Sequence, residues 1–200
     1  MRALGLSLLV VALGLTIFWY VTDGIQALTT EGARRLTVER DRPTIADAQL
    51  TTMDGNVVRL RPPPGKIAMV EFIYTTCPTL CQEAAADLSR VRDKLVQLGL
   101  GDKVKIYSIS FDLDIDQVEQ LQTYGEFHNA DGAIWTITRP RNQDLPKLLE
   151  TFGVTIIPDE FGGYEHNAAI HLIDEQSRMF AIVDTDDIDA AVTAAVKAVK

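Results

Sequence analysis

The arrangement that most constrains the fold is a strand that leads directly into two cysteines and then into a helix. Residues 67–74 (IAMVEFIY) form a mostly apolar run of strand length, which is typical of a buried strand. After Cys77, apolar residues recur at helical spacing over 80–98, and Gly99 ends the pattern. Cys77 and Cys81 are therefore predicted at the entry to a helix, close to the end of a buried strand.

The rest of the chain alternates between strand-like and helix-like segments. A turn signal at Asp54-Gly55, between two short alternating runs, predicts a hairpin within residues 45–60. Farther along, strands are predicted at 104–111 and 133–138, helices at 117–127, 145–152 and 187–199, and a closing hairpin from 168–173 and 179–183. This order predicts an α/β fold and is compatible with a thioredoxin-like central sheet flanked by helices.

The N-terminal segment is apolar enough to suggest a membrane anchor. Residues 3–21 contain nineteen positions without a charge, which as a helix suffice to cross a hydrocarbon core of about 30 Å. We therefore predict one transmembrane signal-anchor helix at 1–22, a juxtamembrane linker at 23–43 and a single thioredoxin-like domain at 44–200.

The flanks of this segment predict its orientation. Arg2 precedes the apolar run, and Trp19 and Tyr20 close it, which favours a cytoplasmic N-terminus and a soluble domain in the periplasm or an equivalent space. A cleaved signal peptide is the alternative, although the run is longer than a usual signal core and no small-x-small site follows closely. Since both cases place the domain in an oxidising compartment, a structural disulfide has to be considered.

The overall charge argues against one class of partner. The net charge is −9 at pH 7 and the sequence pI is about 4.8. Because the average surface repels a phosphate backbone, nucleic-acid binding is disfavoured.

The spacing of the two cysteines allows three roles. Cys77 and Cys81 are four residues apart, which on a helix places their Cα atoms roughly 6 Å apart on one face. The positive potential at a helix N-terminus favours thiolate over thiol. A metal pair, a redox-active dithiol and a structural disulfide all fit this geometry, although a bridge that closes so short a loop stabilises little.

A third metal ligand must be sought among three histidines. His166 lies in a glycine-bearing loop at 162–167 just before a strand, whereas His171 lies inside that strand and His128 follows a helix. His166 is therefore the better candidate, and His128 is assigned no function. Two thiolates and one imidazole suit Cu(I), and an added weak ligand would let the site hold Cu(II). Structural zinc usually requires four ligands, so copper is preferred.

Three segments together resemble the SCO/SenC family of copper proteins for cytochrome c oxidase assembly. Residues 74–82 (YTTCPTLCQ) resemble the family's Tyr-Thr-x-Cys-Pro-x-x-Cys-Pro signature. Residues 108–112 (SISFD), followed by Asp116, resemble its strand ending in Asp-Pro-Glu-Arg-Asp, and Glu165-His166 before 170–174 (IHLID) resembles its Asp-His segment. The similarity covers roughly 44–199. Departures are Gln82 and Leu113, where the family commonly has proline, and the divergent segment 114–118.

The resemblance implies a ligand set of Cys77, Cys81 and His166. It places His171 where the family usually has tyrosine, so His171 is not carried over as a ligand. Asp112 matches an acidic residue of the family near the metal loop, which implies that it orients the site or a partner. The alternative is that Asp112 is an exposed carboxylate at the end of a strand, without a role in the site.

The function implied by the resemblance is that of a copper metallochaperone, which is a carrier rather than an enzyme. It would pass copper to the dinuclear copper centre of cytochrome c oxidase subunit II or to another copper-receiving protein. The alternative is a thiol:disulfide oxidoreductase in which Cys77 attacks first and His166 is not needed.

Overall fold

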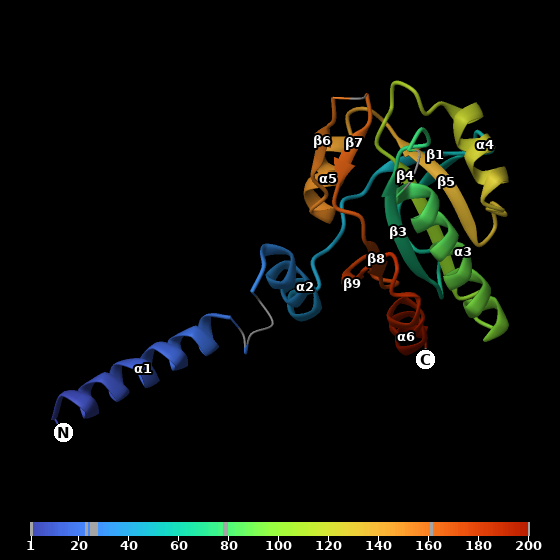
Figure 1. Cartoon of the computed structure of the whole chain (residues 1–200). Helices are drawn as coiled ribbons and strands as arrows, with labels where there is room; N and C mark the ends of the chain where they lie inside the picture. The colour runs from blue at the N-terminus through green and yellow to red at the C-terminus, as the bar shows by residue number, and fades with distance from the viewer. Residues whose placement is uncertain (1, 23, 25–27, 78–79, 161, 200) are drawn as a thin grey trace. The chain divides into compact units, whose positions relative to one another are not determined.

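The computed structural model describes the backbone at residues 2–22, 24, 28–77, 80–160 and 162–199, and the side chains at these positions except 2–4, 6, 80 and 81. Figure 1 shows the chain, which divides into two compact units, Met1–Arg42 and Pro43–Lys200.

The described part of the first unit is helical. Helix α1 spans Arg2–Val21 and helix α2 spans Thr30–Asp41. The hydroxyl of Thr29 caps α2 by accepting a hydrogen bond from the backbone N–H of Gly32 at 2.9 Å. Among the helices in the described part of the chain, none is both long enough and apolar enough to cross a membrane. The transmembrane helix predicted at 1–22 is therefore not supported.

The second unit is built on a mixed sheet. Its described strands form a seven-stranded sheet in the order β2-β1-β5-β4-β3-β8-β9 (Figure 1). Strands β3, β4 and β5 are parallel to one another, and the outer strands pair antiparallel. The strands are β1 (Gln49–Thr52), β2 (Val57–Arg59), β3 (Ile67–Ile73), β4 (Val104–Ser110), β5 (Trp135–Pro140), β8 (Ile170–Ile173) and β9 (Met179–Val183).

Helices cover both faces of this sheet, so the central strands β3 and β4 are buried on both sides. One face packs against α3 (Leu80–Gln97), α4 (Val118–Phe127) and α6 (Ile188–Val199), and its core includes Leu88 and Leu121. Helix α5 (Leu145–Phe152) lies on the other face, where the ring of Phe152 meets Phe72 of β3 at 5.3 Å between centroids. The predicted α/β, thioredoxin-like arrangement of a central sheet flanked by helices is confirmed.

One predicted loop is a hairpin in the structure. Strands β6 (Ile156–Pro158) and β7 (Tyr164–His166) pair antiparallel, so His166 ends a strand rather than lying in a glycine-bearing loop. Asp159 closes the turn: its backbone N–H donates to the carbonyl of Gly163 at 2.9 Å, and its carboxylate accepts from the N–H of Gly163 at 2.7 Å. Strands of three residues are too short to produce a recognisable sequence alternation.

Candidate metal centre

Cys77 lies in a tight turn between β3 and α3. Its backbone N–H donates to the carbonyl of Tyr74 at 3.3 Å, and the side chain of Gln82 donates to the carbonyl of Cys77 at 3.3 Å. The Cys77 side chain is buried. Cys81 belongs to the first turn of α3, as its predicted place at the helix entry requires, but its side chain and residues 78–79 of the motif lie outside the described part of the structure.

His166 faces the aromatic side chains of the same end of the domain. The centroid of its ring lies 5.1 Å from that of Phe111 and 6.3 Å from that of Tyr74. Burial lowers the pKa of this imidazole, which outweighs the opposite effect of a backbone hydrogen bond at Asn167. The neutral ring is the form that can donate a lone pair to a metal.

Cys77 and His166 line one cavity. Its volume is about 430 Å³, and its lining also includes Glu71, Tyr74 and Tyr164. The structure therefore brings together two of the three predicted ligands, from segments almost ninety residues apart. Among the described side chains, no group of three or more His, Cys, Asp or Glu is arranged to hold a metal ion. Because Cys81 is outside that set, the three-ligand site stays a prediction.

A tyrosine hydroxyl ties the two halves of the site together. The hydroxyl of Tyr74 donates to the carbonyl of Tyr164 at 3.2 Å and accepts from the N–H of the same residue at 3.3 Å. Tyr74 lies on the segment that leads to Cys77, whereas Tyr164 begins β7, which ends at His166. No local sequence pattern indicates this contact, because it joins residues ninety positions apart.

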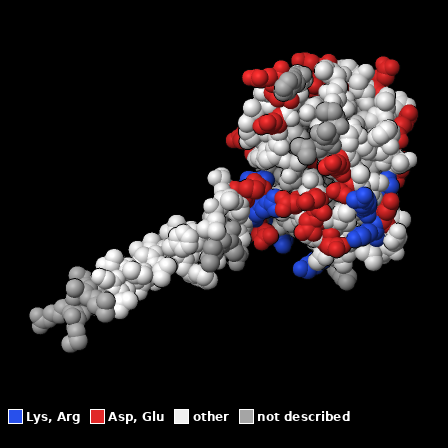
Figure 2. All heavy atoms as spheres, in the orientation of Figure 1, with Lys and Arg blue, Asp and Glu red and all other residues white. Residues whose placement is uncertain are grey.

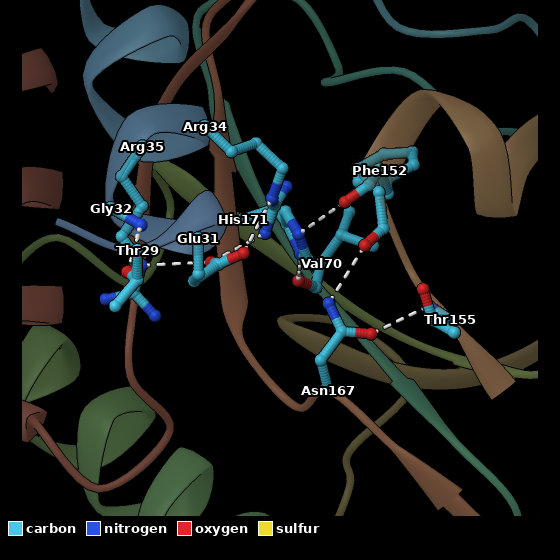
Figure 3. Close-up of polar contacts among 11 residues, drawn as sticks. Thr29, Glu31, Gly32, Arg34, Arg35, Val70, Phe152, Thr155, Asn167 and His171 are labelled. Atoms are coloured by element: carbon cyan, nitrogen blue, oxygen red, sulfur yellow. Dashed lines mark hydrogen bonds and ion pairs between the residues drawn. The ribbon is translucent and has the colours of Figure 1, made fainter. Parts of the chain in front are cut away.

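Asn167 holds the other end of β7. Its side-chain amide donates to the carbonyl of Gly153 at 2.9 Å, and its side-chain oxygen accepts from the N–H of Thr155 at 2.7 Å (Figure 3). His166 therefore lies between two anchored neighbours, Tyr164 and Asn167.

The remaining histidines have packing roles. The ring nitrogens of His171 lie 3.3 Å from the carbonyl oxygen of Val70 and 3.1 Å from that of Phe152, so the ring bridges β3 and the end of α5 (Figure 3). His128 ends α4 with its ring centroid 4.4 Å from that of Tyr124. Neither is among the described residues that line the cavity.

Asp112 is buried at the end of β4, with only 6% of its surface exposed. Burial raises the pKa of its carboxyl, and the nearby charges of Asp116 and Asp114 add to that effect. The alternative of an exposed strand-end carboxylate is therefore wrong. Asp112 is not among the described residues that line the cavity.

A buried carboxyl group at the base of the cavity was not anticipated. Glu71 lies in the middle of β3 with 2% of its surface exposed, and burial raises its pKa to about 7. Its side chain accepts a hydrogen bond from the hydroxyl of Ser108 at 2.5 Å, and that hydroxyl accepts one from the indole N–H of Trp135 at 2.8 Å. Its presence in an otherwise apolar strand was the available sequence signal.

The surface charge near the β6–β7 hairpin is negative. Asp and Glu side chains gather on the upper end of the domain in Figure 2, the end where Figure 1 labels β6 and β7. Exposed residues there include Glu160 and Glu165. A surface of this sign attracts cations and repels anions.

Comparison with known proteins decides the family. A sequence model of SCO1/SenC matches residues 38–200, which is most of the chain. The chain belongs to the SCO1/SenC family. Comparison of this SCO1/SenC protein with curated proteins gave no significant match.

Solved structures share the fold of this SCO1/SenC protein. A SCO1/SenC family lipoprotein from Bacillus anthracis is 20% identical, with a TM-score of 0.72 over 80% of this chain and 96% of that chain. Arabidopsis thaliana ScoI, solved with copper bound, is 22% identical, with a TM-score of 0.66 over 78% and 98%. BsSco, described as a Sco family member of cytochrome c oxidase assembly proteins with a disulfide switch, is 20% identical, with a TM-score of 0.67 over 78% and 93%.

Proposed function

We propose that this protein is a copper metallochaperone that binds copper through Cys77, Cys81 and His166. The observation that carries the proposal is that Cys77 and His166 line the same cavity although they come from distant segments. Its recipient would be the dinuclear copper centre of cytochrome c oxidase subunit II, or another copper-receiving protein. Membership of the SCO1/SenC family supports this role.

The donor set fits copper as cargo. Thiolate sulfur and neutral imidazole are soft to intermediate ligands, and three of them suit Cu(I). Cys81 belongs to the first turn of α3, where free backbone N–H groups favour a thiolate, and burial lowers the pKa of His166, which favours the neutral ring. A low-coordinate site also leaves room for a ligand of the recipient to enter, so copper can pass by ligand exchange.

Relatives and the N-terminal sequence supply the cellular setting of the proposal. The copper-bound A. thaliana ScoI and the assembly protein BsSco support copper delivery to the oxidase. An extracytoplasmic domain held by the segment at 1–22 stays a prediction from sequence. Fusing a reporter enzyme that is active only outside the cytoplasm to the C-terminus would test it, and an inactive, intact fusion would contradict it.

The test is Cu(I) binding measured by competition with a chromogenic chelator. The wild type, His166→Ala and the control His128→Ala are reduced and titrated under anaerobic conditions. We expect one tightly bound Cu(I), an affinity loss of at least tenfold in His166→Ala, which corresponds to about 1.4 kcal/mol, and little change in His128→Ala. Circular dichroism checks that both variants are folded.

The same variants separate the alternative function. A thiol:disulfide oxidoreductase would reduce a model disulfide at the same rate with and without His166, because the exchange needs only Cys77 and Cys81. Absence of tight copper binding in the wild type, together with rapid disulfide reduction that is insensitive to His166→Ala, would replace the chaperone proposal with the oxidoreductase.

A further inference from the structure

A buried carboxylate lies beside the turn that carries Cys77. Asp116 follows β4 in sequence and none of its surface is exposed. Its carboxylate accepts hydrogen bonds from the backbone N–H of Thr75 at 3.0 Å, from the hydroxyl of Thr75 at 2.5 Å, and from the hydroxyl of Ser110 at 2.5 Å. Three donors from two segments therefore converge on one side chain.

These contacts fix both segments that approach the site. Thr75 lies two residues before Cys77, and both its backbone and its side chain are bound to the same carboxylate. The Ser110 hydroxyl also accepts a hydrogen bond from the N–H of Asp112 at 3.1 Å. Between these residues lies Phe111, whose ring packs against that of His166. The hydrogen bonds of Asp116 thus hold Thr75, two residues before Cys77, and Ser110, the chain neighbour of the Phe111 that packs on His166.

General stability is a poor explanation for this arrangement. A buried charge is costly unless it is paired or fully hydrogen-bonded. None of the ion pairs in the described part of the chain includes Asp116, so its hydrogen-bond donors compensate for burial. Two of its three donors belong to the residue that begins the cysteine turn. A carboxylate retained at this cost is best explained by what it holds in place.

We propose that Asp116 is a positioning residue for the metal site, which holds the turn at Thr75 so that Cys77 faces the cavity shared with His166. The inference rests on the proposed copper binding and deepens it. A turn that is already ordered loses less conformational freedom when the thiolate binds, so copper is held more tightly. Loosening the turn would weaken binding and alter the geometry of the sulfur at the metal.

The test uses the full chain in detergent, because large apolar side chains described in α1, such as those of Leu8 and Phe18, are exposed. Asp116→Asn replaces one acceptor oxygen with an NH2 donor, and Thr75→Val replaces the hydroxyl with a methyl group. Thr75→Ser keeps the hydroxyl and removes the methyl group instead. Asp131→Asn is the matched control. Asp131 lies in the loop before β5, and its carboxylate also accepts from two backbone N–H groups, those of Ile134 and Trp135.

Two properties of the copper site are measured in these variants: the Cu(I) affinity and the absorption spectrum with Cu(II). We expect Cu(I) affinity to fall roughly 10- to 100-fold in Asp116→Asn, as is typical for groups that orient metal ligands, and less in Thr75→Val. With Cu(II), the sulfur-to-copper charge-transfer band should shift in both variants and return in Thr75→Ser. Wild-type affinity and an unshifted band in folded Asp116→Asn and Thr75→Val would overturn the proposal.

A second measurement separates this proposal from the proposed function. If the wild type binds no copper, the chaperone role fails, but the position of Cys77 can still be followed in the metal-free protein. Its alkylation rate, quantified by fragment-ion mass spectrometry that distinguishes Cys77 from Cys81 in their shared peptide, should change several-fold in Asp116→Asn and Thr75→Val and stay unchanged in Asp131→Asn. Equal rates in all the proteins would refute positioning by Asp116.

Discussion

Replacing Glu71 with glutamine should change how stability depends on pH. Burial shifts the pKa of this carboxyl from 4.5 to about 7, so the fold favours the protonated acid. Between pH 4.5 and about 7 the unfolded chain ionises at this position while the folded chain does not, and wild-type stability falls as pH rises. Below that window the contribution is fully present, and above it the loss is complete.

The size of the effect follows from the shift. Each pKa unit corresponds to about 1.4 kcal/mol, so a group raised from 4.5 to about 7 should lose about 3 kcal/mol of stability across the window. Glutamine is close in shape to the protonated acid, cannot ionise, and retains an oxygen that can accept from Ser108. Glu71→Gln should therefore become more stable relative to the wild type by about 3 kcal/mol between pH 4 and pH 8.

The assay is urea unfolding of the metal-free wild type and Glu71→Gln at several pH values, followed by the fluorescence of the buried Trp135. The difference between the two free energies of unfolding cancels the contributions of carboxyl groups that both proteins share. Parallel curves from pH 4 to pH 8 would show that Glu71 is ionised throughout the folded range or is exposed to water, and would refute the reasoning.

Three further substitutions test the packing around the site. Tyr74→Phe removes both hydrogen bonds to Tyr164 and should cost about 1–2 kcal/mol of stability and weaken Cu(I) binding. The control Tyr107→Phe loses one long hydrogen bond of 3.4 Å and should change copper binding little. Equal copper affinities in the two variants would contradict a role of the Tyr74–Tyr164 contact in the site. Leu88→Ala empties a fully buried position and should cost about 2–5 kcal/mol in urea unfolding, and a loss below about 1 kcal/mol would contradict the described core. Gly125→Ala would place a methyl group 2.5 Å from the sulfur of Met53, so a thermal unfolding temperature that does not fall would contradict this close approach.

The main elements of the domain were predictable because local patterns specify them. The apolar run of β3, the helical spacing after Cys77 and the Asp54-Gly55 turn each have a physical cause within a few residues. The backbone N–H of Gly55 donates to the carbonyl of Thr52 at 2.9 Å with a φ of +76°, a conformation that glycine adopts without strain. Local chemistry was sufficient at these places.

The parts of the site that escaped prediction depend on contacts between distant segments. The hydrogen bonds of Asp116 with Thr75 span forty-one positions, and those of Tyr74 with Tyr164 span ninety. Periodicity carries no information about such pairs. Asp112 shows the same limit: its place at the end of a strand was readable, but its burial depends on the segments that cover it.

Under the proposed function, the cavity shared by Cys77 and His166 would also link copper uptake to folding. Cys77 and Cys81 follow β3 in sequence, whereas His166 lines the cavity with Cys77 only when the β6–β7 hairpin is docked on Tyr74. A chain that has folded only its first half has the thiols but lacks the imidazole. Tight copper binding would then be a late event that marks completed folding, and copper present at a thousand times its dissociation constant would stabilise the finished domain by about 4 kcal/mol.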